Sequence, residues 1–382
     1  MKFTDCIEIV GSKPTLYEGT KQYVSTGAVE EYFININSIE EYTYNERPSR
    51  ADLVGKSGDI LFAKMAETKK TLILDKETEN YLFSTGFFAI RPKSGILTTK
   101  CLYYLLNSKN FLSQKDKNSS GATQKAITNS GLEKINVNIP LFSKQDHIVK
   151  QFDLLTDIIK KYQSQLEKLD LIIKSRFIEM FGDPLSNPKE WEKKELQELV
   201  TDDCTISYGI VQTGENQKEG IKVFRPIDIV NRKPVLSELI KTTEEISNKY
   251  KKTLLKGREL LITVRANIGD TCVIGSEFKG CNVGRGIVPI RTNERLITLE
   301  FLKNQFDTVE MNRYVKSLAK GITLIQLNME DLRKINLIVP PLELQNEYTA
   351  FVQQIDKSKF AVQKSLEKAE TLYKSLMQEY FG

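Results

Sequence analysis

Residues 145–182 read QDHIVKQFDLLTDIIKKYQSQLEKLDLIIKSRFIEMFG, and this stretch decides the fold of the chain. Its apolar residues recur alternately four and three positions apart, a spacing typical of the seam along which one long helix packs against another. At about 1.5 Å per residue, a helix of this length extends over ~55 Å. The seam consists of Ile148, Phe152, Leu155, Ile159, Tyr162, Leu166, Leu169 and Ile173.

A second stretch with the same register lies 200 residues further along the chain, and only Lys359 interrupts its seam. Each stretch follows a proline, which cannot continue a strand ladder, and ends in Phe-Gly, where glycine suits the left-handed turn after a helix. Antiparallel pairing would bring Gly382 near Met1, whereas parallel pairing would place both globular parts at one end; we predict the antiparallel pair. The second seam consists of Tyr348, Val352, Ile355, Lys359, Val362, Leu366, Ala369 and Tyr373.

The same 200-residue offset runs through the rest of the chain. A buried strand is expected at 59–62 and again at 259–262, and a short helix is expected to begin near Thr98 and again near Thr298. Coincidences at one spacing indicate a duplicated unit. We therefore predict an α+β fold in which two similar mixed α/β domains are separated by two long antiparallel coiled-coil helices with a pseudo-twofold internal repeat. The predicted boundaries are 1–143 for the first domain, 144–182 for the first long helix, 183–343 for the linker and second domain, and 344–382 for the second long helix.

Composition narrows the class of protein. The 382 residues carry a formal net charge of +5, and lysine and arginine are spread along the chain, which permits a polyanionic partner without requiring one. Five cysteines without paired spacing favour a reducing compartment and disfavour zinc. No run approaches the ~18 apolar residues of a membrane span. We expect a soluble, cytoplasmic protein without a membrane partner.

Motifs of catalysis are missing from the sequence. The only histidine, His147, falls in the first turn of a long helix, where a solvated position is the expected role. Histidine-based triads and metal clusters are thereby excluded, and neither a Walker A loop nor a dinucleotide-type glycine loop is present. The sequence therefore predicts a chain that is not an enzyme and that holds neither a metal nor a cofactor.

A set of short motifs follows one order along the chain, and this order is more specific than any single motif. The motifs are Gly58-Asp59-Ile60-Leu61, Phe181-Gly182-Asp183-Pro184 with Asn187-Pro188-Lys189 and Trp191, Tyr208-Gly209-Ile210-Val211, Phe224-Arg225-Pro226 with Asp228-Ile229, and the Ile-Asn…Pro…Gln entries at 135–145 and 335–345. In this order they resemble the specificity (S) subunits of type I restriction-modification systems. The resemblance covers essentially the whole chain.

The resemblance implies a function and a set of partners. Each globular domain would be a target-recognition domain that reads one half of a bipartite, asymmetric site in double-stranded DNA. The helices would set the unread spacer and dock two methyltransferase (M) subunits, which hold S-adenosylmethionine; restriction (R) subunits, up to two, would use ATP and Mg²⁺. The alternative is a non-catalytic scaffold whose two globules bind protein on a coiled-coil spacer.

Basic and amide side chains on matching loops are the candidate DNA contacts. Arginine and lysine can donate to guanine or neutralise phosphate, and asparagine can pair with adenine. For any single residue a solvated loop is an equal alternative, and Arg91 and Arg291, which close strands in both copies, are expected to be structural. The candidates are Ser25, Thr26, Lys64, Lys69, Lys70, Gln124, Lys125, Arg225, Arg265, Asn267, Arg285, Lys320 and Thr323.

Apolar residues beside the helix seams, together with repeated residues at the helix ends, are the candidate contacts for a protein partner. For the residues beside the seams, we favour packing against the recognition domains over a docking surface for a methyltransferase subunit. The end residues recur in both copies, so a duplicated surface would recruit two copies of one partner. The candidates are Leu154, Ile158, Ile172, Phe177, Phe181, Met377, Tyr380 and Phe381.

Overall fold

The computed structural model describes residues 1–31, 33–230, 233–234, 237, 239–321 and 325–382. The chain forms two compact units. Unit 1 comprises Met1–Ser164 and Gln363–Gly382, and unit 2 comprises Gln165–Val362. Each unit therefore contains one globular part together with a segment of each long helix.

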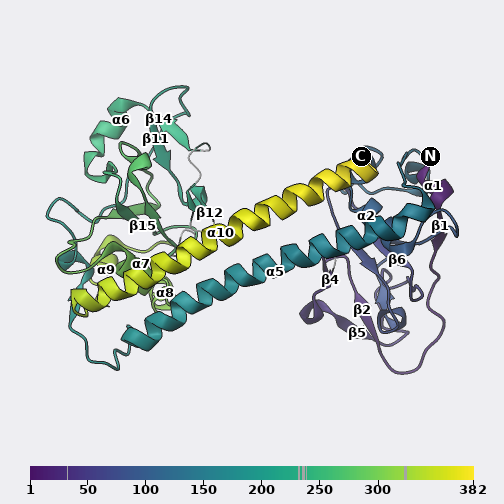
Figure 1. Cartoon of the computed structure of the whole chain (residues 1–382), viewed down its shortest axis with the longest axis horizontal. Helices are drawn as coiled ribbons and strands as arrows, with labels where there is room; N and C mark the ends of the chain where they lie inside the picture. The colour runs from purple at the N-terminus through teal and green to yellow at the C-terminus, as the bar shows by residue number, and fades with distance from the viewer. Residues whose placement is uncertain (32, 231–232, 235–236, 238, 322–324) are drawn as a thin grey trace. The chain divides into compact units, whose positions relative to one another are not determined.

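The two long helices are α5 (Phe142–Phe181), teal in Figure 1, and α10 (Leu342–Phe381), yellow in Figure 1. In unit 1 the start of α5 packs against the end of α10, and the Phe152 ring lies 5.9 Å from the Phe381 ring. In unit 2 the end of α5 packs against the start of α10, where Tyr348 Oη donates to the Ile173 carbonyl at 3.2 Å. The predicted antiparallel pairing is confirmed, and every predicted seam residue is buried or half-buried.

Lys359, the one charged residue of the seams, is accommodated by an ion pair. Its Nζ lies 2.6 Å from Asp170 Oδ1 on α5 and 3.8 Å from Asp356 Oδ1 on its own helix. The aliphatic stem can fill the seam while the ammonium group reaches these carboxylates at the helix surface.

A buried glutamine joins each long helix to its globular part. Gln145 Oε1 accepts from the Thr98 backbone N–H at 2.9 Å, and its Nε2 donates to the Ile96 and Pro140 carbonyls at 2.8 and 3.1 Å. Gln345 makes the same three bonds in unit 2, to residues 298, 296 and 340 at 2.9, 3.0 and 2.7 Å. The predicted internal repeat thus extends to individual side-chain hydrogen bonds.

In the described part of unit 1, a four-stranded sheet has the order β1-β9-β6-β7, a three-stranded sheet has the order β5-β2-β8, and β3 pairs with β4. All pairs are antiparallel except β2 with β8. The strands are β1 (Ile7–Val10), β2 (Lys21–Val24), β3 (Val29–Glu30), β4 (Phe33–Ile34), β5 (Glu40–Tyr42), β6 (Ile60–Ala63), β7 (Thr71–Ile73), β8 (Leu82–Phe83) and β9 (Phe87–Pro92). The short helices are α1 (Phe3–Cys6), α2 (Thr99–Leu106), α3 (Lys109–Lys117) and α4 (Asn129–Leu132).

In the described part of unit 2, β16-β15-β18 and β14-β11-β17 form three-stranded sheets, and β12-β13 and β10-β19 form pairs. The strands are β10 (Lys193–Glu195), β11 (Ile221–Phe224), β12 (Ile229–Val230), β13 (Lys233–Pro234), β14 (Ile240–Thr242), β15 (Glu259–Thr263), β16 (Thr271–Ile274), β17 (Asn282–Val283), β18 (Ile287–Ile290) and β19 (Asn336–Ile338). The short helices are α6 (Glu244–Lys249), α7 (Leu299–Phe306), α8 (Val309–Ser317) and α9 (Met329–Arg333).

The strand registers of the two units differ by the predicted 200 residues. Ile60 opposes Ile90 in unit 1, and Leu260 opposes Ile290 in unit 2. The central strands β6 and β15 are buried along their whole length, as their continuous apolar runs predict. The short helices match too: the hydroxyls of Thr98 and Thr298 each accept the backbone N–H three residues later and cap α2 and α7.

The largest core of each unit lies between its central sheet, its short helices and its share of the long helices. In unit 1 it includes Phe111 and Phe152 with Phe381 from the far end of the chain. In unit 2 it includes Phe177 and Tyr348. Because residues from both long helices enter each core, neither globular part packs without them.

Candidate nucleic-acid interface

Three loops of unit 1 are held together by backbone hydrogen bonds. The Lys64 N–H donates to the Gly86 carbonyl at 2.9 Å, and the Ile127 N–H donates to the Lys64 carbonyl at 2.9 Å. Met65 also forms an antiparallel bridge with Ala126. The loop after β6, the turn before β9 and the turn at 120–126 therefore form one edge, which we call the loop edge of unit 1.

Unit 2 has the same frame. The Val264 N–H donates to the Gly286 carbonyl at 2.8 Å, the Leu327 N–H donates to the Val264 carbonyl at 3.0 Å, and Arg265 bridges Gln326. By this register Lys64 corresponds to Val264. The counterpart of Arg265 is thus residue 65, one place after Lys64, as the sequence offset predicts.

A fourth loop presses against each edge at a glycine. A Cβ atom added at Gly86 would lie 2.8 Å from Thr26 Cγ2, and one added at Gly286 would lie 2.3 Å from Pro226 Cγ. These distances leave no room for a side chain. The loop with Ser25 and Thr26 and the loop with Arg225 and Pro226 therefore lie at the corresponding loop edges.

Two of the candidate lysines of unit 1 are bound to the protein itself. Lys64 Nζ donates to the Thr85 carbonyl at 2.8 Å and lies 4.5 Å from the centre of the Phe88 ring. Burial lowers the pKa of this ammonium group. Lys70 Nζ donates to the Thr26 carbonyl at 2.7 Å and so ties the fourth loop to the edge.

The other candidates of unit 1 are more open. Lys69 is exposed and forms a loose ion pair with Glu31 at 3.8 Å. Gln124 and Lys125 are exposed in the turn at 120–126. Ser25 is half-exposed, and its hydroxyl accepts the Ala28 N–H at 3.2 Å. The side chains most open to a ligand here are therefore those of residues 69, 124 and 125.

A buried lysine that was not among the candidates holds the loop after β6 in place. Lys115 on α3 is 1% exposed, and its Nζ donates to the carbonyls of Met65 and Thr68 at 2.8 and 2.7 Å. The next residue, Asp116, accepts the Glu67 N–H at 2.9 Å. The sequence signal was present, because residue 115 lies four positions after Phe111 on the buried face of α3.

In unit 2 the candidate Arg225 is paired within its own loop. Its Nε and Nη2 donate to the two carboxylate oxygens of the buried Asp228 at 3.0 and 2.8 Å. These bonds raise the pKa of the Arg225 guanidinium. The pair fixes the loop that presses on Gly286, so the local role of Arg225 is structural.

Arg265 and Asn267 lie on the loop after β15. Arg265 is half-exposed, and its Nε donates to Gln326 Oε1 at 3.0 Å. Asn267 is exposed, and its carbonyl accepts the Asp270 N–H at 3.1 Å. Gln326 was not a candidate in the sequence, because its partner lies 61 residues away and no local pattern marks it.

Arg285 projects from the turn between Gly284 and Gly286. It is exposed, and its guanidinium lies 5.9 Å from the centre of the Tyr208 ring, which is 41% exposed. Gly209 brings this tyrosine close to β17, because a Cβ atom there would lie 1.7 Å from the Val283 carbonyl oxygen. An exposed arginine and aromatic ring thus lie together beside the loop edge of unit 2.

Lys320 begins the last turn of the unit 2 edge. Its Nζ lies 3.0 Å from Asp331 Oδ2, and this contact lowers the pKa of the Asp331 carboxyl. Its backbone pairs with Gln326. The remaining candidate, Thr323, lies outside the described residues.

The structure separates the candidates for a protein partner into two groups. Leu154 and Ile172 are 61% and 44% exposed, so packing against the globular parts, which the sequence favoured, does not bury them, and Ile158 is half-buried. The structure corrects the prediction of a docking surface at the helix ends. Their aromatic and methionine side chains fill the cores of the two units, so they are not available as an open docking surface, and Tyr380 is half-buried. The buried residues are Phe177, Phe181, Met377 and Phe381.

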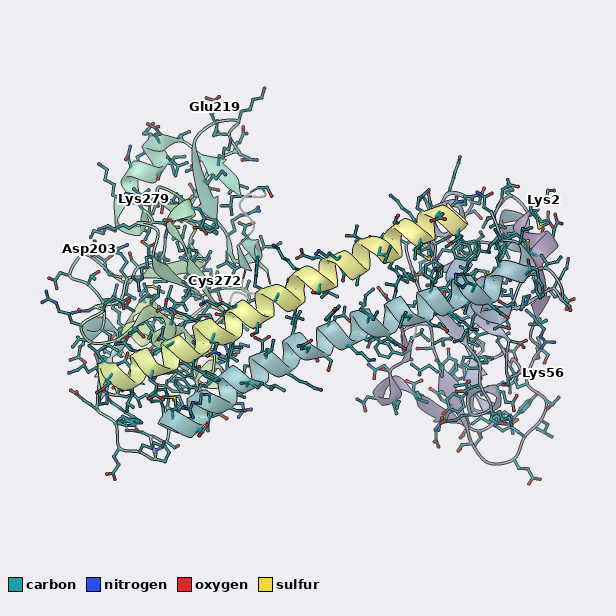
Figure 2. The ribbon with its side chains drawn as sticks, viewed as in Figure 1. Lys2, Lys56, Asp203, Glu219, Cys272 and Lys279 are labelled. Carbon is teal, nitrogen blue, oxygen red and sulfur yellow. The ribbon has the colours of Figure 1, made fainter. Side chains whose placement is uncertain are left out.

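Charged pairs away from the loop edges are structural. Arg91 Nε and Nη2 donate to Oδ1 of the buried Asp59 at 2.8 and 2.6 Å. Arg291 lies 3.6 Å from the buried Glu259 and donates from Nη2 to the carbonyl of Asp203, which is labelled in Figure 2, at 2.8 Å. Both arginines therefore secure the start of a central strand.

Within the described ranges, no group of three or more His, Cys, Asp or Glu side chains is arranged to hold a metal ion. All five cysteines are buried and unpaired, among them Cys272 in Figure 2. His147 is exposed on α5. No described helix combines the length and apolar character that crossing a membrane requires.

Comparison with known protein sequences finds one family. Residues 8–168 and 188–370 match the model of the type I restriction modification DNA specificity domain. The type I restriction enzyme EcoBI specificity subunit of Escherichia coli is 22% identical over 298 residues, which cover 71% of this chain and 63% of that subunit. The match thus spans less than two thirds of that relative. The putative MjaX specificity subunit of Methanocaldococcus jannaschii is 23% identical over 337 residues, covering 84% of this chain and 76% of that subunit.

Solved structures share the fold. A chain from a study of complex assembly and conformational transition of the type I R-M system aligns with a TM-score of 0.58 and 20% identity, over 98% of this chain and 97% of that chain. The S subunit of a type I restriction-modification system from M. genitalium aligns with a TM-score of 0.54 and 13% identity, over 100% of this chain and 95% of that chain.

Proposed function

The chain belongs to the type I restriction-modification DNA specificity family, and on this premise we propose that it selects the DNA sequence on which a type I complex acts. Each unit would read one half of a bipartite, asymmetric site in double-stranded DNA. The chain itself would be non-catalytic. S-adenosylmethionine would be held by two methyltransferase subunits, and ATP with Mg²⁺ by restriction subunits.

The observation that carries this proposal is a duplicated loop edge with unlike side chains. Unit 1 offers Lys69 and Lys125 there, and unit 2 offers Arg265, Arg285 and Lys320. Cationic side chains on loops can contact phosphates and guanine edges. Because equivalent backbone positions carry two different sets of side chains, we expect the two units to bind two different half-sites.

Exposed apolar residues on the long helices support a protein partner. Ile172 and Leu372 lie 200 residues apart and are 44% and 50% exposed, and Leu154 is 61% exposed. In unit 2, Leu171, Ile172 and Phe351 line one groove of the helix pair. The exposed apolar position that the two units share suits two copies of one partner, which we propose to be the methyltransferase subunit.

The cytoplasm, where the DNA of a restricting cell lies, is the proposed location. Five buried, unpaired cysteines suit a reducing compartment.

Methylome sequencing of a host with and without this gene tests the proposal directly. We expect one methylated motif to disappear with the gene, and we expect that motif to consist of two different half-sequences around an unread spacer. DNA affinity of the complex with its methyltransferase should fall steeply with salt, because phosphate contacts release counterions. An unchanged methylome together with salt-independent binding would instead favour the protein-binding scaffold.

A further inference from the structure

One pair of positions occupies the same place in both loop edges. Residues 65 and 126 form an antiparallel bridge in unit 1, and residues 265 and 326 form the matching bridge in unit 2. Ala126 and Gln326 are each anchored to the residue six positions earlier, with N–H to carbonyl distances of 3.0 Å in both units. The backbone at the two sites is therefore equivalent, and only the side chains differ.

In unit 2 this pair is an arginine braced by a glutamine. Arg265 Nε donates to Gln326 Oε1 at 3.0 Å, and its Nη2 donates to the same oxygen. A guanidinium carries five N–H donors in a rigid planar fork. Using the edge formed by Nε and Nη2 leaves the edge formed by Nη1 and Nη2 for a ligand. That edge has the spacing that matches O6 and N7 of guanine in the major groove.

In unit 1 the pair is Met65 and Ala126, and neither side chain can donate a hydrogen bond. Both are half-buried, as are Arg265 and Gln326, so the pair lies at the surface of each edge rather than in a core. The equivalent backbone positions thus carry hydrogen-bond donors in unit 2 and apolar side chains in unit 1. An apolar pair offers contact to a thymine methyl group but no hydrogen bond to guanine.

We propose that these paired positions are specificity determinants: Arg265 reads a guanine, Gln326 is a positioning residue that holds its guanidinium plane, and Met65 with Ala126 removes that preference from the other half-site. The inference rests on the proposed function and deepens it. Bracing matters because a long, flexible arginine otherwise loses side-chain freedom when it binds a base.

The first test uses the full chain with its methyltransferase and a duplex library randomised over both half-sites. Arg265→Met installs the residue of unit 1, and we expect the preference for guanine at one base pair of one half-site to fall about 5- to 150-fold. Arg265→Lys keeps the charge but loses the fork, so that preference should fall while the salt dependence of affinity stays. Gln326→Ala should weaken the same preference less. Arg295→Met is the matched control, because it replaces an exposed arginine beyond the opposite end of β18, and it should leave the preference unchanged.

The second test is a transplant. Met65→Arg combined with Ala126→Gln should create a new guanine preference in the half-site that the single substitutions left intact. The half-site read by unit 1 also serves as a folding control for each Arg265 and Gln326 variant. Its base preference should persist in a folded protein. If guanine discrimination survives Arg265→Met, or falls equally in both half-sites, the inference is wrong while the proposed function stands. If the unaltered complex selects no split sequence, both fail together.

Discussion

At Lys115 a buried ammonium group holds the backbone of the loop that carries Lys64, Lys69 and Lys70. Two loop carbonyls accept from its Nζ. The corresponding residue of unit 2 is Val315, also buried, and there Asn312 Nδ2 donates to the Gly269 carbonyl at 3.1 Å instead. The two loops therefore join equivalent pairs of strands, but different side chains secure them.

Lys115→Met tests this anchor. The substitution leaves the carbonyls of Met65 and Thr68 without their donor, and an unsatisfied buried polar group costs about 1–3 kcal/mol. We expect the free energy of unfolding of the chain to fall by about this amount and sequence discrimination to weaken in the half-site read by unit 1 alone. Denaturant unfolding and selection from a randomised duplex library measure the two effects.

Lys109→Met is the matched control, because residue 109 is exposed on the same helix. It should change neither stability nor discrimination. Equal effects of the two substitutions, or a loss that reaches both half-sites, would show that Lys115 does not act through its loop.

Among the elements, the stability of the long helices depends on the hydrogen bonds at their first turns as well as on the apolar seams. Gln345 is fully buried, and two of its three hydrogen bonds join α10 to Leu296 and Thr298 at the start of α7, while the third goes to the Pro340 carbonyl just before α10. Its counterpart Gln145 does the same for α5 and α2. An apolar residue of similar size would leave one N–H and two carbonyls buried without partners.

Gln345→Leu should therefore lower the free energy of unfolding by more than 2 kcal/mol, since several buried groups at about 1–3 kcal/mol each lose their partner. Thermal unfolding followed by circular dichroism would show a lower Tm. Gln353→Leu removes an exposed glutamine from the same helix and should leave the Tm nearly unchanged. Indistinguishable Tm values for the two variants would refute the structural role.

At the scale of the whole molecule, unit 1 contains both ends of the chain. The Met1 amino group donates to the Val137 carbonyl at 3.3 Å, and Asn110 Nδ2 donates to the Phe381 carbonyl at 3.2 Å. Both chain ends are marked in Figure 1. Residues Gln363–Gly382 therefore supply part of the core of unit 1.

Truncation after Gly182 tests this dependence. The fragment 1–182 lacks Phe381, but its own helix end carries Phe181 at the repeated position. We expect two copies to exchange helix ends and form a homodimer with twofold symmetry, because burying these aromatic side chains is worth about 1.5–3 kcal/mol each. Sedimentation equilibrium measures the mass.

The same fragment with Phe177→Asp and Phe181→Asp is the control and should remain monomeric. A folded monomer of the unsubstituted fragment would contradict the expectation, since it would mean that unit 1 completes its core without a second helix end.

The architecture of the chain can be predicted from its sequence alone. Heptad spacing depends on residues three and four apart, so Phe152 and Tyr348 mark the seams without any knowledge of distant contacts. The 200-residue offset then places most strands and helices of one copy on the other, including the threonine caps and glutamine bridges, although α6 has no helical counterpart at 44–49. Local periodicity and duplication are written along the chain, and for this reason both can be read from it.

Which candidate side chains are open to a ligand depends on contacts that form only when the chain folds. Lys64 is bound to Thr85 and Arg225 to Asp228, while Phe177 and Met377 lie in cores. The bracing of Arg265 by Gln326 joins loops 61 residues apart. Hydrogen bonds and burial depend on which loops meet in space, and no local pattern carries that information.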